Sequence, residues 1–418
     1  MRKAIVILLT IALTGRGAAS SVAQASQSSA SIWLYMALLS PFVASASIAV
    51  FYRYLGDRAA YIGAFSGLVS FLSVLMLYGD KAVISSSWIP SLGISAEFYV
   101  DGLSLLLATL ASGIGVLVFL YSYRYMKHDG WKHKYYTVLT AFMGSMIGLV
   151  FSSDLIFLFM FWEFTSICSF LLISHNQRTK GGIASSKKSL LVTVGSGLLL
   201  LIGIILLGET AGTYSIAEML TQDSLLEEIK GEGLYLPILA LIGTGAAAKS
   251  AQVPFHIWLP DAMEAPTPVS AFLHSATMVK AGVFLIGRFR PILMQGETWN
   301  LIFVTAGLLT MTLAAILAVG AEELKELLAY STASHLGLIV AGFGFTGVLG
   351  AETASFHIFN HAIFKASLFM VAGIILHEAG TQKIKKLSGL RKKWPILAVI
   401  TTLSGLSMAG IPPLNGFY

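Results

Sequence analysis

Residues 354–376 read ASFHIFNHAIFKASLFMVAGIIL, an apolar run long enough to cross a bilayer as a helix, which takes about 20 residues. His357, His361 and Lys365 interrupt this run at intervals of four residues. At about 100° per residue, each step of four drifts only ~40° around a helix, so the three side chains are predicted to share one stripe. Ionisable groups inside a membrane span are costly and usually functional, so the stripe indicates a proton relay. Interhelical hydrogen bonding without transport is the alternative.

The rest of the chain is apolar in the same way. Of its 418 residues, 56% are hydrophobic and only 11% are charged, against about 25% charged in soluble proteins. So little charge excludes a soluble globule and a disordered chain, and the apolar runs do not alternate as they would in a β-barrel. We therefore predict an all-α polytopic transmembrane protein with about 12 spans. The candidate spans are residues 32–52, 59–78, 101–123, 135–152, 154–174, 189–208, 234–253, 269–287, 300–320, 327–345, 354–376 and 395–411.

The N-terminus has the pattern of a signal peptide. Arg2 and Lys3 precede the apolar run 4–14, and an A-x-A cleavage pattern follows at 23–25. We expect residues 1–25 to be a signal peptide; an uncleaved extra span is the alternative. Either reading places residue 30 on the external side of the membrane.

The basic residues set the orientation. With the N-terminus outside and the spans alternating, 17 Lys and Arg residues, Lys325 among them, fall in inside loops. Four fall in outside loops, namely Lys81, Lys230, Arg288 and Arg290. This asymmetry follows the positive-inside rule, so the net charge of +6 reflects topology in a plasma membrane and not nucleic-acid binding.

Three further ionisable residues lie within predicted spans: Glu163, Lys249 and Lys280. Burial disfavours the charged form of a lysine and of a carboxylate, so buried groups of both kinds can exchange protons near neutral pH. Glu163 and Lys249 suit a switchable pair, because each would be costly alone. Histidine can pass protons between such groups.

Two spans carry helix breakers. Pro254 follows Lys249 closely, and Pro412 and Pro413 lie near the end of the chain. Irregular backbone at membrane depth is tolerated where it lines a cavity, and paired interrupted helices point to a transport site. Ordinary loop prolines at the ends of spans are the alternative.

Five segments carry a resemblance to a known family. They are AAAKSAQVPFHIWLPDAMEAPTPVSAFLHSATMVKAG (246–282), FMFWEFTSICSFLLI (159–173), ELKELLAYSTASHLG (323–337), FHIFNHAIFKASLFM (356–370) and GIPPLNGF (410–417). In order and spacing they resemble the antiporter-like membrane subunits of Mrp-type cation/proton antiporters, respiratory complex I and membrane-bound hydrogenases. Among these, the first segment is most similar to the A-type Mrp antiporter protein.

The resemblance implies two inverted five-helix repeats, each with a broken helix. N-terminal helices would occupy 26–134, the first repeat 135–290 and the second repeat 291–418. The second repeat is expected to be incomplete, as in a short homologue or a fragment, because the family continues past GF to a residue that ends the half-channel. The family's proton-transfer residues map to Glu163, Lys249, Lys280, His357, His361 and Lys365, with His256 and His274 in support. His335 departs from the small or amide residue of the family, and its role stays open.

The resemblance implies a proton-translocating subunit of a cation/proton antiporter, working with other integral membrane subunits on H⁺ and Na⁺ or K⁺. A proton-pumping subunit of a redox-driven complex and a non-transporting scaffold are the alternatives. The single cysteine, Cys168, excludes a cysteine-based metal site, and no strand–helix unit carries GxGxxG. We therefore expect a transporter subunit with no metal and no cofactor of its own.

Overall fold

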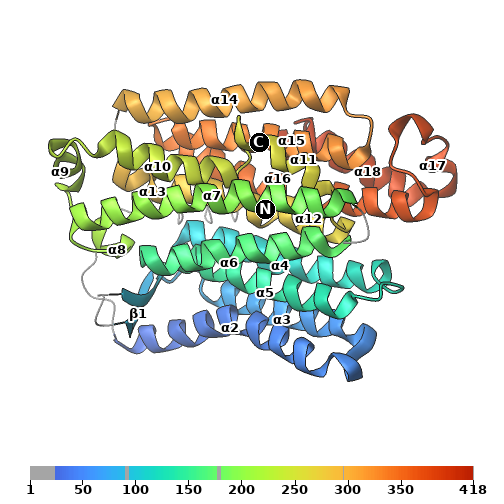
Figure 1. Ribbon diagram of the computed structural model, residues 1–418, viewed down its shortest axis with the longest axis horizontal. Helices are drawn as coiled ribbons and strands as arrows, with labels where there is room; N and C mark the ends of the chain where they lie inside the picture. Colours follow the sequence, from blue (N-terminus) through green and yellow to red (C-terminus); the bar gives the residue numbers. More distant parts are fainter. Residues whose placement is uncertain (1–23, 90–93, 177–179, 295, 418) are drawn as a thin grey trace.

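The computed structural model describes residues 24–89, 94–176, 180–294 and 296–417. Long helices lie side by side along one direction, from α2 (Gln24–Leu55) at the lower edge to α14 (Gly296–Gly320) at the upper edge (Figure 1). A short β-hairpin lies at one end of these helices, which we call the hairpin end. The predicted signal peptide, residues 1–25, lies outside the described residues apart from its last two positions, so its cleavage stays a prediction.

The remaining α-helices are α3 Ala59–Met76, α4 Gly102–Tyr125, α5 Lys132–Phe151, α6 Leu155–Ile173, α7 Lys180–Ala211, α8 Ile216–Met219, α9 Leu225–Gly231, α10 Tyr235–Lys249, α11 Trp258–Asp261, α12 Thr267–Ser275, α13 Met278–Leu293, α15 Leu324–Gly344, α16 Val348–Ala379, α17 Leu390–Lys393 and α18 Pro395–Met408. Single 3₁₀ turns are η1 Gly56–Arg58, η3 Ser174–Asn176, η4 Phe255–Ile257, η5 Ala262–Glu264, η6 Ile384–Lys386 and η7 Asn415–Phe417. The most apolar stretch of α12 and α13 is entirely buried, whereas most of α14 is exposed, so α12 and α13 form the centre of the bundle.

The prediction of a polytopic helical membrane protein is confirmed, and its count of about 12 spans is approximate. Nine helical segments in the described ranges are long and apolar enough to cross a membrane. A tenth arises if α9 and α10, bent by 110°, form one span. The count treats Ala30–Met76 as one segment, although Ser70 of α3 donates to Ala37 O of α2 at 2.8 Å, as in a hairpin of two helices. Helix α18 is shorter than a full span.

The all-α prediction missed one feature, the hairpin of β1 (Ala82–Ile89) and β2 (Ile94–Val100). The strands are antiparallel, and Ala82 pairs with Val100. The hairpin lies in what the sequence indicated only as a loop between two spans. Directly after β2, the Asp101 side chain accepts from Ser104 N and caps α4.

Helix α10 breaks where Pro254 predicted. It ends at Lys249, and Ala251 then adopts a left-handed backbone with φ of 52°. Val253 N donates to Thr310 Oγ1 of α14 at 3.0 Å, which holds the irregular segment in place. The span predicted at 269–287 is also interrupted, at Ala276 and Thr277, which the sequence did not indicate. This second break places Lys280 at the beginning of α13.

Two basic residues that were expected in loops are buried within helices. Arg288, expected in an outside loop, lies inside α13 because this helix continues past the predicted end of the span. It is 4% exposed and binds both carboxylate oxygens of Asp101, at 2.5 and 3.0 Å. Lys325, expected in an inside loop, is buried in the first turn of α15 and donates to two backbone carbonyls, those of Met263 and Ala265.

Candidate proton-transfer site

Lys249 is fully buried at the end of α10. Its ammonium donates to Trp162 O at 2.5 Å and to Thr165 Oγ1 at 2.6 Å, both on α6. The Trp162 ring lies 4.0 Å from the ammonium, a cation–π distance. The α10 break leaves this lysine at the tip of a helix, where its ammonium reaches the neighbouring helix.

Glu163 is half-buried on α6 and turns towards α7. A β-carbon at Gly197 of α7 would overlap Glu163 Oε1, so only glycine leaves room for the carboxylate there. Oε1 has no hydrogen-bond partner among the described residues. Within the same ranges Lys249 forms no ion pair, so the predicted Glu163–Lys249 pair is not in contact in this structure.

Lys280 is fully buried in α13, and its ammonium donates to Ile358 O of α16 at 2.8 Å. Two residues later, Gly282 packs directly against the end of α10. A β-carbon at position 282 would overlap Ala246 O and lie 2.6 Å from Ser250 N. Helix α13 therefore touches the Lys249 end of α10 and the histidine-bearing face of α16 within one helical turn.

Three histidines form a cluster between α15 and α16. His335 Nδ1 and His357 Nε2 lie 2.9 Å apart, and their rings stack with centroids 5.1 Å apart. The His361 ring lies 5.8 Å from the His335 ring, and all three rings surround Phe364. The sequence left the role of His335 open; the structure places it beside the predicted stripe, across the helix–helix contact.

Lys365 continues the stripe away from the hairpin end and is fully buried. Its ammonium donates to Ser331 Oγ at 2.5 Å and to Leu328 O at 3.3 Å, both on α15. Lys249 and Lys365 thus share one arrangement. In each case a carbonyl and a hydroxyl, three residues apart on a neighbouring helix, accept hydrogen bonds from the ammonium.

His274 and His256 lie apart from these contacts. His274 is fully buried in α12, with its ring 5.8 Å from that of Phe369 and 6.4 Å from that of Trp258. Neither of its ring nitrogens has a partner in the described part of the chain. His256 is half-buried in η4, where it forms no hydrogen bond to the other candidate residues among those described.

A polar clamp joins the irregular segment after α18 to α16, and no sequence pattern indicated it. Asn415 follows Pro412 and Pro413 and exchanges two hydrogen bonds with the buried Asn360, at 2.8 and 3.0 Å. Ser407 of α18 donates to Asn415 Oδ1 at 2.6 Å. Since Asn360 lies between His357 and His361, the clamp fixes the irregular segment against the histidine stripe.

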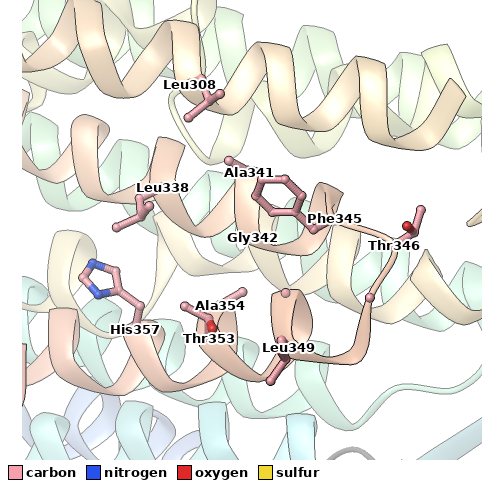
Figure 2. Close-up of a pocket in the computed structure, with 12 residues that line it drawn as sticks. Leu308, Leu338, Ala341, Gly342, Phe345, Thr346, Leu349, Thr353, Ala354 and His357 are labelled. Carbon is pink, nitrogen blue, oxygen red and sulfur yellow. The ribbon is translucent and has the colours of Figure 1, made fainter. Parts of the chain in front are cut away.

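A cavity of about 460 Å³ lies between α14, α15 and α16. Figure 2 shows His357 at one side of this cavity and Thr346, in the turn between α15 and α16, at the other. Leucine, alanine and glycine residues form most of the wall between them.

These features define a multi-pass membrane protein with titratable groups buried between its helices. A family model described as "NADH:quinone oxidoreductase/Mrp antiporter, TM" matches residues 152–418. A second, "NADH-Ubiquinone oxidoreductase (complex I), chain 5 N-terminus", matches residues 88–136. The first match covers more than half of the chain, so the chain belongs to the NADH:quinone oxidoreductase/Mrp antiporter family. The resemblance inferred from the motifs is confirmed.

Two relatives of this chain are antiporter subunits. A probable K⁺/H⁺ antiporter protein of type A/B from Rhizobium meliloti (strain 1021) is 44% identical over 391 residues, which are 91% of this chain and 38% of the relative. A Na⁺/H⁺ antiporter protein of type A1 from Staphylococcus haemolyticus (strain JCSC1435) is 42% identical over 405 residues, which are 92% of this chain and 50% of the relative. The chain spans half the length of these relatives or less.

Two solved structures share the fold. A chain in the structure of the Mrp complex from Dietzia sp. DQ12-45-1b matches with a TM-score of 0.87 and 39% identity, over 92% of this chain and 42% of that one. A chain of the membrane-bound sulfane sulfur reductase, an archaeal respiratory membrane complex, matches with a TM-score of 0.82 and 22% identity, over 94% and 80% of the two chains. The second similarity concerns the fold alone.

Proposed function

We propose that this chain is a proton-translocating subunit of a multisubunit cation/proton antiporter that exchanges H⁺ for Na⁺ or K⁺. The names of the relatives and the Mrp complex structure support this class. The observation that carries the proposal is the 2.8 Å bond from Lys280 to Ile358 O. It connects the α6–α10 group of titratable residues with the α15–α16 group across the buried centre of the bundle.

The first group works as a switch. When Glu163 turns towards Lys249, its charge holds the lysine protonated. When Glu163 turns to α7, as in this structure, the hydrogen-bond partners of the ammonium are neutral, Trp162 O and Thr165 Oγ1. A buried charge whose counter-charge is out of contact is costly, so Lys249 then releases its proton more readily.

The second group carries the proton onward. Lys280 exchanges protons with the histidine cluster, whose members titrate more readily than lysine. His335 belongs to this relay through its 2.9 Å bond to His357. Lys365 follows along α16, held by Ser331. His274 and His256 support the relay from α12 and from the α10 break.

The topology completes the proposal. We place the chain in the plasma membrane with its N-terminus and its hairpin end outside. We assign 26–134 to N-terminal helices, 135–290 to a first repeat and 291–418 to a second repeat. Other integral membrane subunits would surround it, consistent with the exposed apolar face of α14.

Lys249→Ala tests the proposed function. Everted membrane vesicles with the assembled complex are energised, and cation-dependent proton movement is followed with a pH-sensitive dye. We expect this movement to fall to background, because the switch has lost its proton carrier. Lys249→Arg, which keeps a charge that does not deprotonate, should also fail, and a native gel should show normal assembly of both variants. Unchanged proton movement in Lys249→Ala would exclude the assigned role.

A redox-driven complex is the second candidate, favoured by the match to the complex I model at residues 88–136. The same relay would then pump protons for a separate redox module. Co-purification with mass spectrometry decides between the two. Small antiporter-type membrane subunits alone support the antiporter, whereas hydrogenase-like or quinone-site subunits support the pump.

A further inference from the structure

The cavity beside His357 reaches inward from the hairpin end. Arg288 and Arg290 on α13 show that the turn between α15 and α16 lies at this end. Arg288 binds Asp101, which follows β2, and Arg290 Nη2 donates to three backbone carbonyls of the turn, each at 3.0 Å. Thr346 and Gly347 of the same turn line the cavity.

The inner side of the cavity is the histidine cluster. His357 lies nine residues into α16, or roughly 14 Å from the start of the helix at about 1.5 Å per residue. Figure 2 shows its ring at the far side of the cavity from Thr346. His357 is half-buried, and its Nε2 shares a hydrogen bond with Nδ1 of His335. The cavity therefore joins the membrane surface to one member of the relay.

The lining admits water more readily than a metal cation. Thr346, Thr353 and His357 are its polar side chains, and it includes no carboxylate. Na⁺ and K⁺ need several oxygen ligands in place of their water. Arg290 adds a fixed positive charge beside the turn, which opposes entry of metal cations. The cavity of about 460 Å³ is large enough for water, and Thr346, Thr353 and His357 are the side chains that can hydrogen-bond it.

We propose that this cavity is a hydrated access path through which the His335–His357 pair exchanges protons with the medium at the hairpin end. The path rests on the proposed function, since it assigns the outer opening of the same relay. It enters between α15 and α16 and is separate from the irregular segment after α18, which contacts α16 at Asn360.

Cysteine labelling tests the access path in the assembled complex. Cys168→Ala removes the native thiol, which is buried on α6. Thr353→Cys and Thr346→Cys are then placed on the lining, where both side chains are exposed. Leu309→Cys is the matched control, because this residue is exposed in the middle of α14 outside the cavity. Each variant is treated with a membrane-impermeant, charged thiol reagent or with an apolar maleimide.

The access path predicts that the charged reagent labels both lining cysteines from the hairpin side and does not label Leu309→Cys. Labelling of Thr353→Cys should also lower cation-dependent proton movement at least about fivefold, because the adduct blocks the path. Labelling by the apolar maleimide alone would show a lipid-filled cavity and overturn the proposal. Labelling by the charged reagent with unchanged proton movement would overturn it too, while the proposed function would still stand or fall on Lys249→Ala.

Discussion

Helix α13 carries two buried cations eight residues apart, and their surroundings differ. Arg288 donates from two nitrogens to the two oxygens of Asp101, and Asp101 also caps α4. Burial alone would raise the pKa of Asp101, but the charge and hydrogen bonds of Arg288 outweigh it and hold the pKa below its ordinary value. Lys280 has no carboxylate partner in the described ranges and donates to a single backbone carbonyl, Ile358 O.

This is the difference expected between a structural charge and a charge that takes part in proton transport. A bidentate pair fixes both partners in their ionised forms, which suits a joint between helices. A group that must gain and lose a proton needs neutral partners that bind either form. Lys249 and Lys365 resemble Lys280 in this respect, because each donates only to carbonyl and hydroxyl oxygens.

The largest expected effect is on stability, and it separates the two cations of α13. Arg288→Met leaves the largely buried Asp101 carboxylate without its partner, at a cost of about 3–5 kcal/mol. Lys280→Met removes a buried charge that has no counter-charge. The thermal unfolding midpoint of this variant should therefore stay the same as in the wild type or rise. Thermal unfolding of the purified complex compares the two variants.

Asp101→Asn combined with Arg288→Met is the control, since asparagine still caps α4 without leaving a charge. The double variant should recover part of the loss. If Lys280→Met were destabilised as much as Arg288→Met, both Lys280 and Arg288 would be structural charges, and the proposed difference between them would be wrong.

A smaller effect is expected from Gly282→Ala, which tests whether α13 must touch α10. The added methyl would overlap Ala246 O and force the two helices apart, at about 1–3 kcal/mol for an overpacked site. Cation-dependent proton movement should fall, because Lys249 and Lys280 move apart. Gly243→Ala is the matched control on α10, since the nearest atom to its β-carbon is Phe303 Cζ at 3.7 Å. Equal behaviour of the two variants would show that the close approach has no role in the relay.

The sequence predicted the features that depend on one helix. Helical periodicity alone aligned His357, His361 and Lys365, and Pro254 marked the end of α10 close to Lys249. Contacts between helices had no such signal. The bond from His335 to His357 depends on how α15 and α16 pack, and the turn of Glu163 towards Gly197 depends on a rotamer and on the missing side chain of a residue 34 positions away.

The misplaced charges have the same origin. Arg288 was expected in a loop because hydropathy ends a span at its first charges, whereas its partner Asp101 lies 187 residues away in sequence. Asn360 and Asn415 were missed because neutral polar residues do not stand out in an apolar run. Their pairing exists only once α18 lies against α16.

Proton movement through Lys280→Met tests the central claim most directly. The whole complex is reconstituted in proteoliposomes, and cation-driven pH change is measured per assembled complex, with Arg288→Met as the matched variant on the same helix. The relay predicts a loss of at least about a hundredfold in Lys280→Met, because no other side chain of α13 replaces the proton carrier, while surviving Arg288→Met complexes retain most of their rate. A wild-type rate in Lys280→Met would contradict the account.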